Sequence, residues 1–340
     1  MLTSQKSKSW VLLFAAYAVL QVVWTAWIFL PHLSHPLSLK APLVALSGTL
    51  GAAWMIYRIV RIETQSRWWG LIGVGMFAAS YRAMDSYFDV QHSDSWMLFL
   101  VLAGCSMLNY NRNAFGRSAG MLLLVLAFWC KQQAAVFAVG GLFFLLFQAT
   151  AAECLLPGLL ALVFGPILYA WMPASFLGMG LGPSDFNWDA TTLATSEGIR
   201  NFAEPLARRW LMPTILTGAG LMSALKTGAF RSIWIFMVPV AFVTALLGMA
   251  SSGPFETWLI LISVIAIERL TRSLADYTLW PQIALAISFL ALLNDPFSMV
   301  TAPDTRAAYG RPSIANTFSP SVQISKRPYS FEPTTRSGPS

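Results

Sequence analysis

The sequence predicts an all-α protein, a polytopic bundle of about eleven membrane-crossing helices. Hydrophobic residues make up 56% of the 340 residues and charged residues only 11%. The mean hydropathy is +0.60, and soluble domains usually carry about 25% charged residues. The chain is also divided into many apolar runs, several of which approach the roughly 20 residues needed to cross a bilayer. These observations argue against an ordinary soluble domain.

The apolar runs follow one another from a basic leader to residue 293. The length of the first run favours a retained span over a cleaved signal peptide. Polar residues at 131–133 separate two short runs, which predicts two tilted helices meeting at a polar apex or a hairpin that does not fully cross. The runs interpreted as spans are residues 10–30, 41–60, 68–84, 96–108, 118–130, 134–147, 154–172, 210–225, 233–250, 255–267 and 277–293.

Charge placement predicts the topology. Lys and Arg residues lie singly at the ends of the apolar runs, and the positive-inside rule then places the N-terminus in the cytoplasm of a multi-pass inner (plasma) membrane protein. The formal net charge of +7 is spread in the same way, which favours lipid headgroups over nucleic acid.

Two domains are expected on composition. Residues 1–294 form the transmembrane helical domain, with exoplasmic loops near residues 81–95 and 173–205. Residues 295–340 are rich in Pro, Ser and Thr and are expected to form a flexible tail, because such a composition cannot bury a core.

The most polar stretch is YRAMDSYFDVQHSDS, residues 81–95. Asp85, Asp89 and His92 are spaced four and three residues apart, so on a short helix they would share one face, with Asp94 away from it. Two carboxylates and an imidazole on one face suit a divalent cation. The alternative is a set of solvated loop charges at the headgroup level, with Arg82 snorkelling or paired with one of the aspartates.

A second candidate is the cation between two apolar runs, Lys131. It either marks the end of a helix or binds a lipid phosphate, with Gln132 and Gln133 supplying amide hydrogen bonds. Glu256, which follows SSGP and precedes an apolar run, is a weaker candidate for the same pocket.

These motifs resemble a known family. The stretches YFDVQHSDSWMLFLVLAG and AGMLLLVLAFWCKQQAAVFAVGGLFFLL are similar to bacterial integral-membrane glycosyltransferases of the C-type (GT-C) fold. That group includes protein O-mannosyltransferase-like enzymes and enzymes that add sugars to lipid A and other cell-envelope glycans. The matching elements are Phe88-Asp89, Asp94-Ser95, Lys131-Gln132 and the turn GMASSGPFETW, and the resemblance runs from about residue 41 to residue 293.

The resemblance implies a transferase that moves a sugar from a polyprenyl-phosphate donor to a lipid, glycan or protein acceptor on the exoplasmic face. Such a reaction needs a carboxylate to deprotonate the acceptor hydroxyl and cations to hold the leaving phosphate. The expected catalytic residues are Asp89 and Asp94. The expected substrate-binding residues are Arg82, His92, Lys131, Gln132 and Glu256, and the residues suited to a divalent cation are Asp85, Asp89 and His92.

The sequence departs from the family at one place. Relatives carry their main catalytic aspartate in a long loop after the first span, where this chain has the acid-free segment PHLSHPLSLK. Either the chain is truncated and lacks that loop, or Asp89 and Asp94 do the work, or the protein is inactive. A carrier or flippase for a polyprenyl-linked lipid, or an inactive membrane partner of such an enzyme, is the alternative function.

Overall fold

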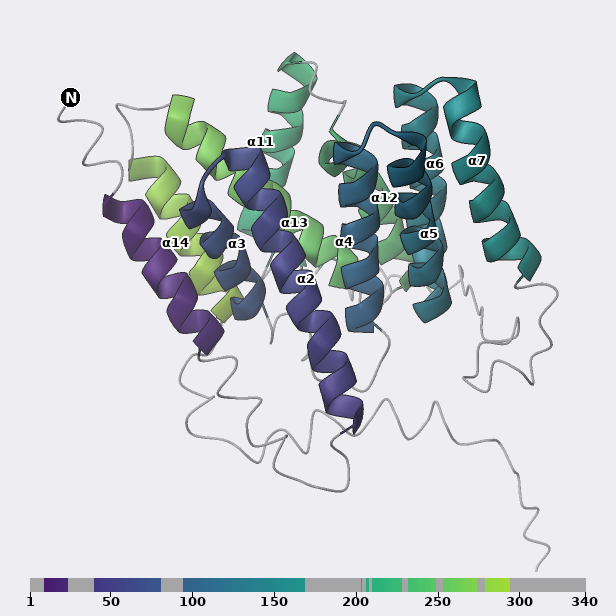
Figure 1. The fold of residues 1–340 in the computed structure, drawn as a ribbon. Helices are drawn as coiled ribbons and strands as arrows, with labels where there is room; N and C mark the ends of the chain where they lie inside the picture. The colour runs from purple at the N-terminus through teal and green to yellow at the C-terminus, as the bar shows by residue number, and fades with distance from the viewer. Residues whose placement is uncertain are drawn as a thin grey trace, which may run out of the picture. The chain divides into compact units, whose positions relative to one another are not determined.

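The structure is a computed structural model, drawn in Figure 1. It describes residues 9–23, 40–80, 94–168, 203, 206–207, 210–227, 232–248, 253–273 and 279–293. The chain divides into two compact units, residues 1–294 and 295–340. The predicted flexible tail, and most of the loop predicted at 173–205, lie outside the described residues.

The regular structure of these residues is helical. A helix over residues 9–23 comes first. The helices that follow are α2 (Lys40–Thr64), α3 (Arg67–Ala79), α4 (Asp94–Tyr110), α5 (Ala114–Cys130), α6 (Ala135–Gln148), α7 (Ala151–Leu162), α11 (Leu211–Thr227), α12 (Ile233–Gly248), α13 (Gly253–Ser273) and α14 (Leu279–Leu293). A 3₁₀ turn, η1 (Gln132–Ala134), separates α5 from α6, and a π-helical turn, η2 (Val163–Ile167), extends α7.

The transmembrane part of the predicted fold class is wrong for the described helices. Among the helices that the structure describes, none is both long enough and apolar enough to pass through a bilayer. The physical reason is that the apolar runs break into short helices, such as α6 with 14 residues and α7 with 12. The longer α2 and α13 carry charged residues, including Arg58 and Arg61 in α2 and Glu256 and Glu268 in α13.

The same finding contradicts the predicted location. A multi-pass protein of the inner membrane with a cytoplasmic N-terminus was expected because of the spans, and the described helices do not supply them. The inside and outside assignments of the loops depended on the same spans and fall with them.

The helices of unit 1 define two ends. Gly48 of α2 lies against Ser95 of α4, and Glu63 of α2 bonds Tyr110 of α4, so these helices run parallel. End A holds the N-termini of α4, α6 and α13 and the C-terminus of α5. End B holds the C-termini of α2, α4, α11 and α13 and the N-termini of α5 and α12. Figure 1 shows α4 and α5 connected at end B, at the top of the view.

An aromatic cluster forms part of the core. Trp258 of α13 and Trp234 of α12 are almost fully buried, with ring centroids 6.1 Å apart. Phe137 of α6 is fully buried and its ring lies 5.2 Å from that of Trp258. The cluster therefore joins three helices that come from distant parts of the sequence.

Helices α4 and α5 cross closely at two glycines. A Cβ atom on Gly104 would lie 2.9 Å from the backbone oxygen of Gly120, and a Cβ on Gly120 would lie 3.0 Å from the backbone oxygen of Gly104. Backbone atoms cannot move aside as a flexible side chain can. The close crossing therefore depends on the absence of side chains at both positions.

We expect Gly104→Ala to lower the free energy of unfolding by about 1–3 kcal/mol, because the added methyl forces the two helices apart. Gly218→Ala on α11 is the matched control, since a Cβ there meets nothing within 4 Å. That control should raise stability slightly, as alanine is the better helix former. Equal effects of the two changes in denaturant titrations would contradict the close crossing.

Candidate functional site

Most of the predicted acidic cluster lies outside the described residues. Arg82, Asp85, Asp89 and His92 belong to the segment 81–93, and the structure describes none of them. In the described ranges, no group of three or more His, Cys, Asp or Glu residues is placed to hold a metal ion. The predicted divalent-cation site therefore stays a prediction.

The remaining predicted site residues all lie at end A. Asp94 is the first residue of α4, and Lys131 directly follows the last residue of α5. The antiparallel pair has Gly104 level with Gly120, so the same register carried ten residues further places Asp94 near the level of Lys131. Gln132 lies in η1 and Glu256 in the first turn of α13, at the same end.

Lys131 ends α5 in an extended conformation. Its φ of −154° and ψ of 125° break the helix, while its backbone N–H still donates to the Ala127 carbonyl at 2.9 Å. Its own carbonyl accepts from the Ala134 N–H at 2.9 Å, which forms η1. A lysine at a helix C-terminus is favoured by the helix dipole, which accounts for a cation between two apolar helices.

Gln133 supplies a hydrogen-bond acceptor in the connection between α5 and α6. Its Oε1 atom is buried and has no hydrogen-bond partner among the described residues. A buried amide oxygen without a partner costs roughly 1–3 kcal/mol, so a hydroxyl or amide group of a ligand would be stabilised there.

Helix ends of both signs lie at end A. The N-termini of α4, α6 and α13 each carry a partial positive charge, and the C-terminus of α5 carries a partial negative charge. Lys131 adds a full positive charge, and the carboxylates of Asp94 and Glu256 are on helices at the same end. A cation and carboxylates at one end of a helical unit could bind an anion and take part in acid–base chemistry.

Ser95, the partner of Asp94 in the sequence motif, packs between helices. It is 2% exposed, and a Cβ on Gly48 of α2 would lie 2.8 Å from its Oγ atom. The adjacent Trp96 donates from Nε1 to the Val44 carbonyl at 2.8 Å, which fixes α4 against α2. Ser95 therefore belongs to the α2–α4 contact.

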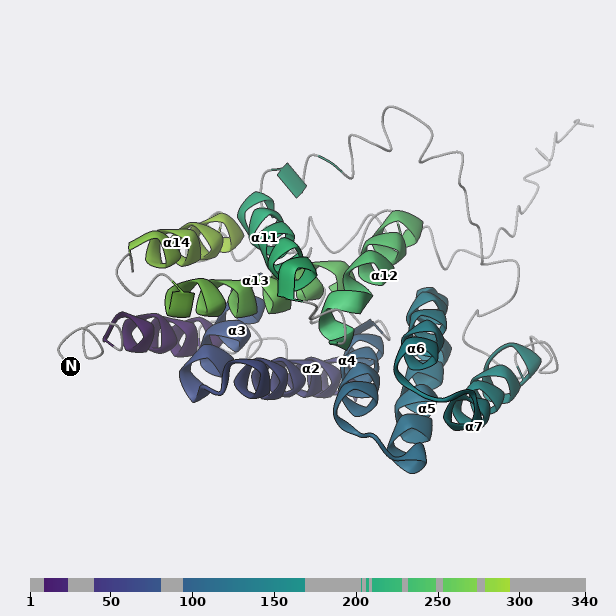
Figure 2. The same ribbon diagram turned by 90° about the horizontal axis from the view of Figure 1, so that it is seen from above.

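Exposed apolar side chains cover α6 and α7, which lie beside each other and beside α5 (Figure 2). On α6 they recur at helical spacing, as Val139, Phe143, Leu146 and Phe147, and on α7 they include Leu155, Leu159 and Leu162. Phe147 is 78% exposed. Apolar patches of this kind usually mark a surface that contacts another apolar molecule.

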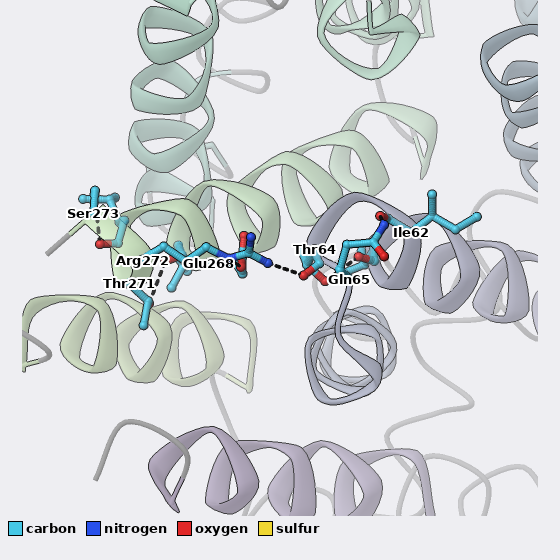
Figure 3. A network of polar contacts seen from close by, with 10 residues as sticks. Ile62, Thr64, Gln65, Glu268, Thr271, Arg272 and Ser273 are labelled. Atoms are coloured by element: carbon cyan, nitrogen blue, oxygen red, sulfur yellow. Dashed lines mark hydrogen bonds and ion pairs between the residues drawn. The ribbon is translucent and has the colours of Figure 1, made fainter. Parts of the chain in front are cut away.

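A polar network at end B was missed from the sequence (Figure 3). Arg272 of α13 forms an ion pair with Glu268, one turn earlier, and donates from Nη2 to the Thr64 carbonyl at 2.5 Å. Thr64 is the last residue of α2, so this bond satisfies a carbonyl that its own helix cannot. The signal that was overlooked is Glu268 itself, a single acid at the end of the apolar run LILISVIAIE.

A second missed group links α2, α4 and α12. The Tyr110 hydroxyl donates to Glu63 Oε1 at 2.8 Å and accepts from Trp234 Nε1 at 3.2 Å. Burial is the main cause that raises the Tyr110 pKa above its usual value, and the nearby Glu63 carboxylate adds to it. Tyr110 therefore stays protonated and serves as a structural bridge.

Burial raises the pKa of the Glu268 carboxyl, and the neighbouring Arg272 and Arg269 offset this only in part. The folded state then binds this proton more tightly than the unfolded state does. The contribution of Glu268 to the free energy of unfolding is fully present below the usual glutamate pKa, about 4.3. It is lost as the pH rises through the higher pKa of the folded state. We expect Glu268→Gln to remove this loss, as measured by unfolding at a series of pH values.

Glu153 provides the contrasting variant for this pH series. Its pKa is lowered, first by the hydrogen bond from Arg117, so its contribution is present above the usual glutamate pKa and is lost as pH falls. Glu153→Gln should therefore reduce the loss of stability that the original protein shows as the pH falls below the usual glutamate pKa. An unchanged slope in Glu268→Gln above the usual glutamate pKa would contradict the assignment.

The chain matches no family model, no curated protein and no solved structure.

Proposed function

We propose that this chain transfers a sugar from a polyprenyl-phosphate donor to a lipid, glycan or protein acceptor, with the reaction at end A. The observation that supports the proposal is that Asp94, Lys131 and Glu256 belong to helix ends on the same end of the helical unit. The sequence resemblance to C-type glycosyltransferases motivates the choice of reaction.

The proposed donor has two parts that call for different surfaces. Its phosphate suits Lys131 and the helix N-termini of end A, because both favour negative charge. Its prenyl chain suits the exposed side chains of α6 and α7, since α6 begins at end A directly after η1. An amphipathic donor can contact both surfaces at once.

The reaction needs one proton transfer and one displacement. Asp94 takes the proton of the acceptor hydroxyl as that oxygen bonds to the anomeric carbon of the sugar. The bond from the anomeric carbon to the phosphate oxygen breaks, and polyprenyl phosphate leaves with the electron pair. Lys131 stabilises the leaving phosphate, and Gln133 Oε1 accepts a hydrogen bond from a sugar hydroxyl.

The direct test uses purified full-length protein with polyprenyl phosphates that carry a labelled hexose or pentose. The proposal predicts donor binding by native mass spectrometry and movement of label into an acceptor fraction, with heated protein as the control. Binding without transfer would replace the enzyme with a carrier or an inactive partner. A failure to bind any such donor would overturn both.

A further inference from the structure

End B carries cations that point to a second binding surface. Arg61 lies in the last turn of α2, Arg67 begins α3 and Arg112 lies between α4 and α5. Lys226 lies in the last turn of α11, and all four of these side chains are exposed.

The packing places all four at the same end. Arg272 of α13 bonds the last carbonyl of α2, and Glu63 of α2 bonds Tyr110, the last residue of α4. Helix α11 runs parallel to α13, because Thr217 donates to the Leu259 carbonyl at 3.4 Å and Gly220 lies against Ile262. The C-termini of α2, α4, α11 and α13 are therefore together.

The carboxylates at end B are already engaged. Among the described residues they belong to Glu63, bonded to Tyr110, to Glu153, paired with the buried Arg117, and to Glu268, paired with Arg272. No ion pair between described residues involves Arg61, Arg67, Arg112 or Lys226, and with the three acids counted this end still has more cationic than acidic side chains. A concentration of positive charge on one end attracts an anionic partner.

Exposed aromatic rings lie beside these cations. Trp68 follows Arg67 and is 48% exposed, and Phe115, three residues after Arg112, is 81% exposed. Phe147 lies at the same end, since its ring is 6.0 Å from that of Phe236 in the first turn of α12. Aromatic rings among cations suit the interface of a lipid layer, where rings enter the headgroup region and cations meet phosphates.

We propose that end B binds the headgroups of anionic phospholipids through Arg61, Arg67, Arg112 and Lys226, with Trp68 and Phe115 entering the headgroup layer. This surface is at the opposite end from the proposed transferase site and goes beyond it. Each cation near an anionic surface contributes about five-fold in affinity, so three of them contribute about a hundred-fold.

The test is co-sedimentation of the full-length protein with vesicles of phosphatidylcholine alone or mixed with phosphatidylglycerol. The proposal predicts tighter binding to the mixed vesicles and a weakening with added salt. The triple variant Arg61→Gln, Arg67→Gln, Arg112→Gln should lose about a hundred-fold in affinity for mixed vesicles. The matched variant with lysine at all three positions keeps the charge and should bind like the original protein.

Four outcomes would overturn the proposal. They are equal binding to both vesicles, unchanged binding of the glutamine variant, equal loss in the lysine variant, and preference for a single-stranded oligonucleotide over mixed vesicles. Circular dichroism of each variant separates lost binding from lost folding. Sugar transfer is measured without vesicles. A negative vesicle-binding result therefore does not contradict the proposed transferase activity, and a negative transfer result does not contradict lipid binding at end B.

Discussion

Replacing Trp258 with alanine is expected to lower the free energy of unfolding by about 3–5 kcal/mol. Trp258 is fully buried on α13 and its ring contacts those of Phe137 and Trp234. Truncation leaves a cavity where α6, α12 and α13 meet, and the surrounding rings cannot all close it. Denaturant titration followed by circular dichroism measures the loss.

Two variants make this expectation specific. Trp258→Phe keeps most of the packing and removes a buried Nε1–H that has no partner among the described residues. Because such a donor costs about 1–3 kcal/mol, this change should be far milder than the alanine substitution. Trp54→Ala, at a site that is 60% exposed, should change stability by less than about 0.5 kcal/mol. A similar loss at Trp54 and Trp258 would contradict the placement of the core.

Replacing Asp94 with asparagine is expected to reduce sugar transfer by about 10²–10⁴-fold with donor binding unchanged, because the general base is lost and the shape is kept. Lys131→Ala should weaken donor binding and also slow transfer, because Lys131 holds the phosphate both in the bound donor and as it leaves. Loss of a charged hydrogen bond of about 1.5–3 kcal/mol would weaken donor binding by roughly 10–100-fold. Rates and donor affinities measured on the same preparations distinguish the two roles.

Arg58→Ala is the control for both variants, since Arg58 is an exposed cation on α2 outside end A. It should leave transfer and donor affinity unchanged. If Asp94→Asn retains full turnover, another group is the base. If Lys131→Ala binds the donor normally, the phosphate lies elsewhere.

Helix positions could be predicted from the sequence because hydropathy records which segments avoid water. The break expected at residues 131–133 is present, where α5 ends and η1 begins. Hydropathy does not record helix length. In the described part of the run 154–172, α7 ends at Leu162 and is followed by the π-helical turn η2, which contains Gly165 and Pro166, and no described helix there is long enough to cross a bilayer.

A candidate site residue can be recognised from the sequence when it is charged and its neighbours in the sequence are apolar. Lys131 was predicted as a site residue because it is a cation between two apolar runs, and the structure places it at the C-terminal end of α5, at end A. The contacts of Arg272 with Thr64 and of Tyr110 with Glu63 were not predicted. Each joins residues far apart in sequence, and such pairs depend on helix packing that no local pattern records.

Helix α13 also has a consequence for biosynthesis. It contacts α2, α3, α4, α11, α12 and α14, yet it occupies residues 253–273, near the end of unit 1. Chains emerge from the ribosome from the N-terminus, so the earlier helices leave the exit tunnel before their shared partner has been made. Nascent chains halted before α13 are therefore expected to expose apolar surface and to depend on chaperones, with protease resistance gained only once α13 has emerged.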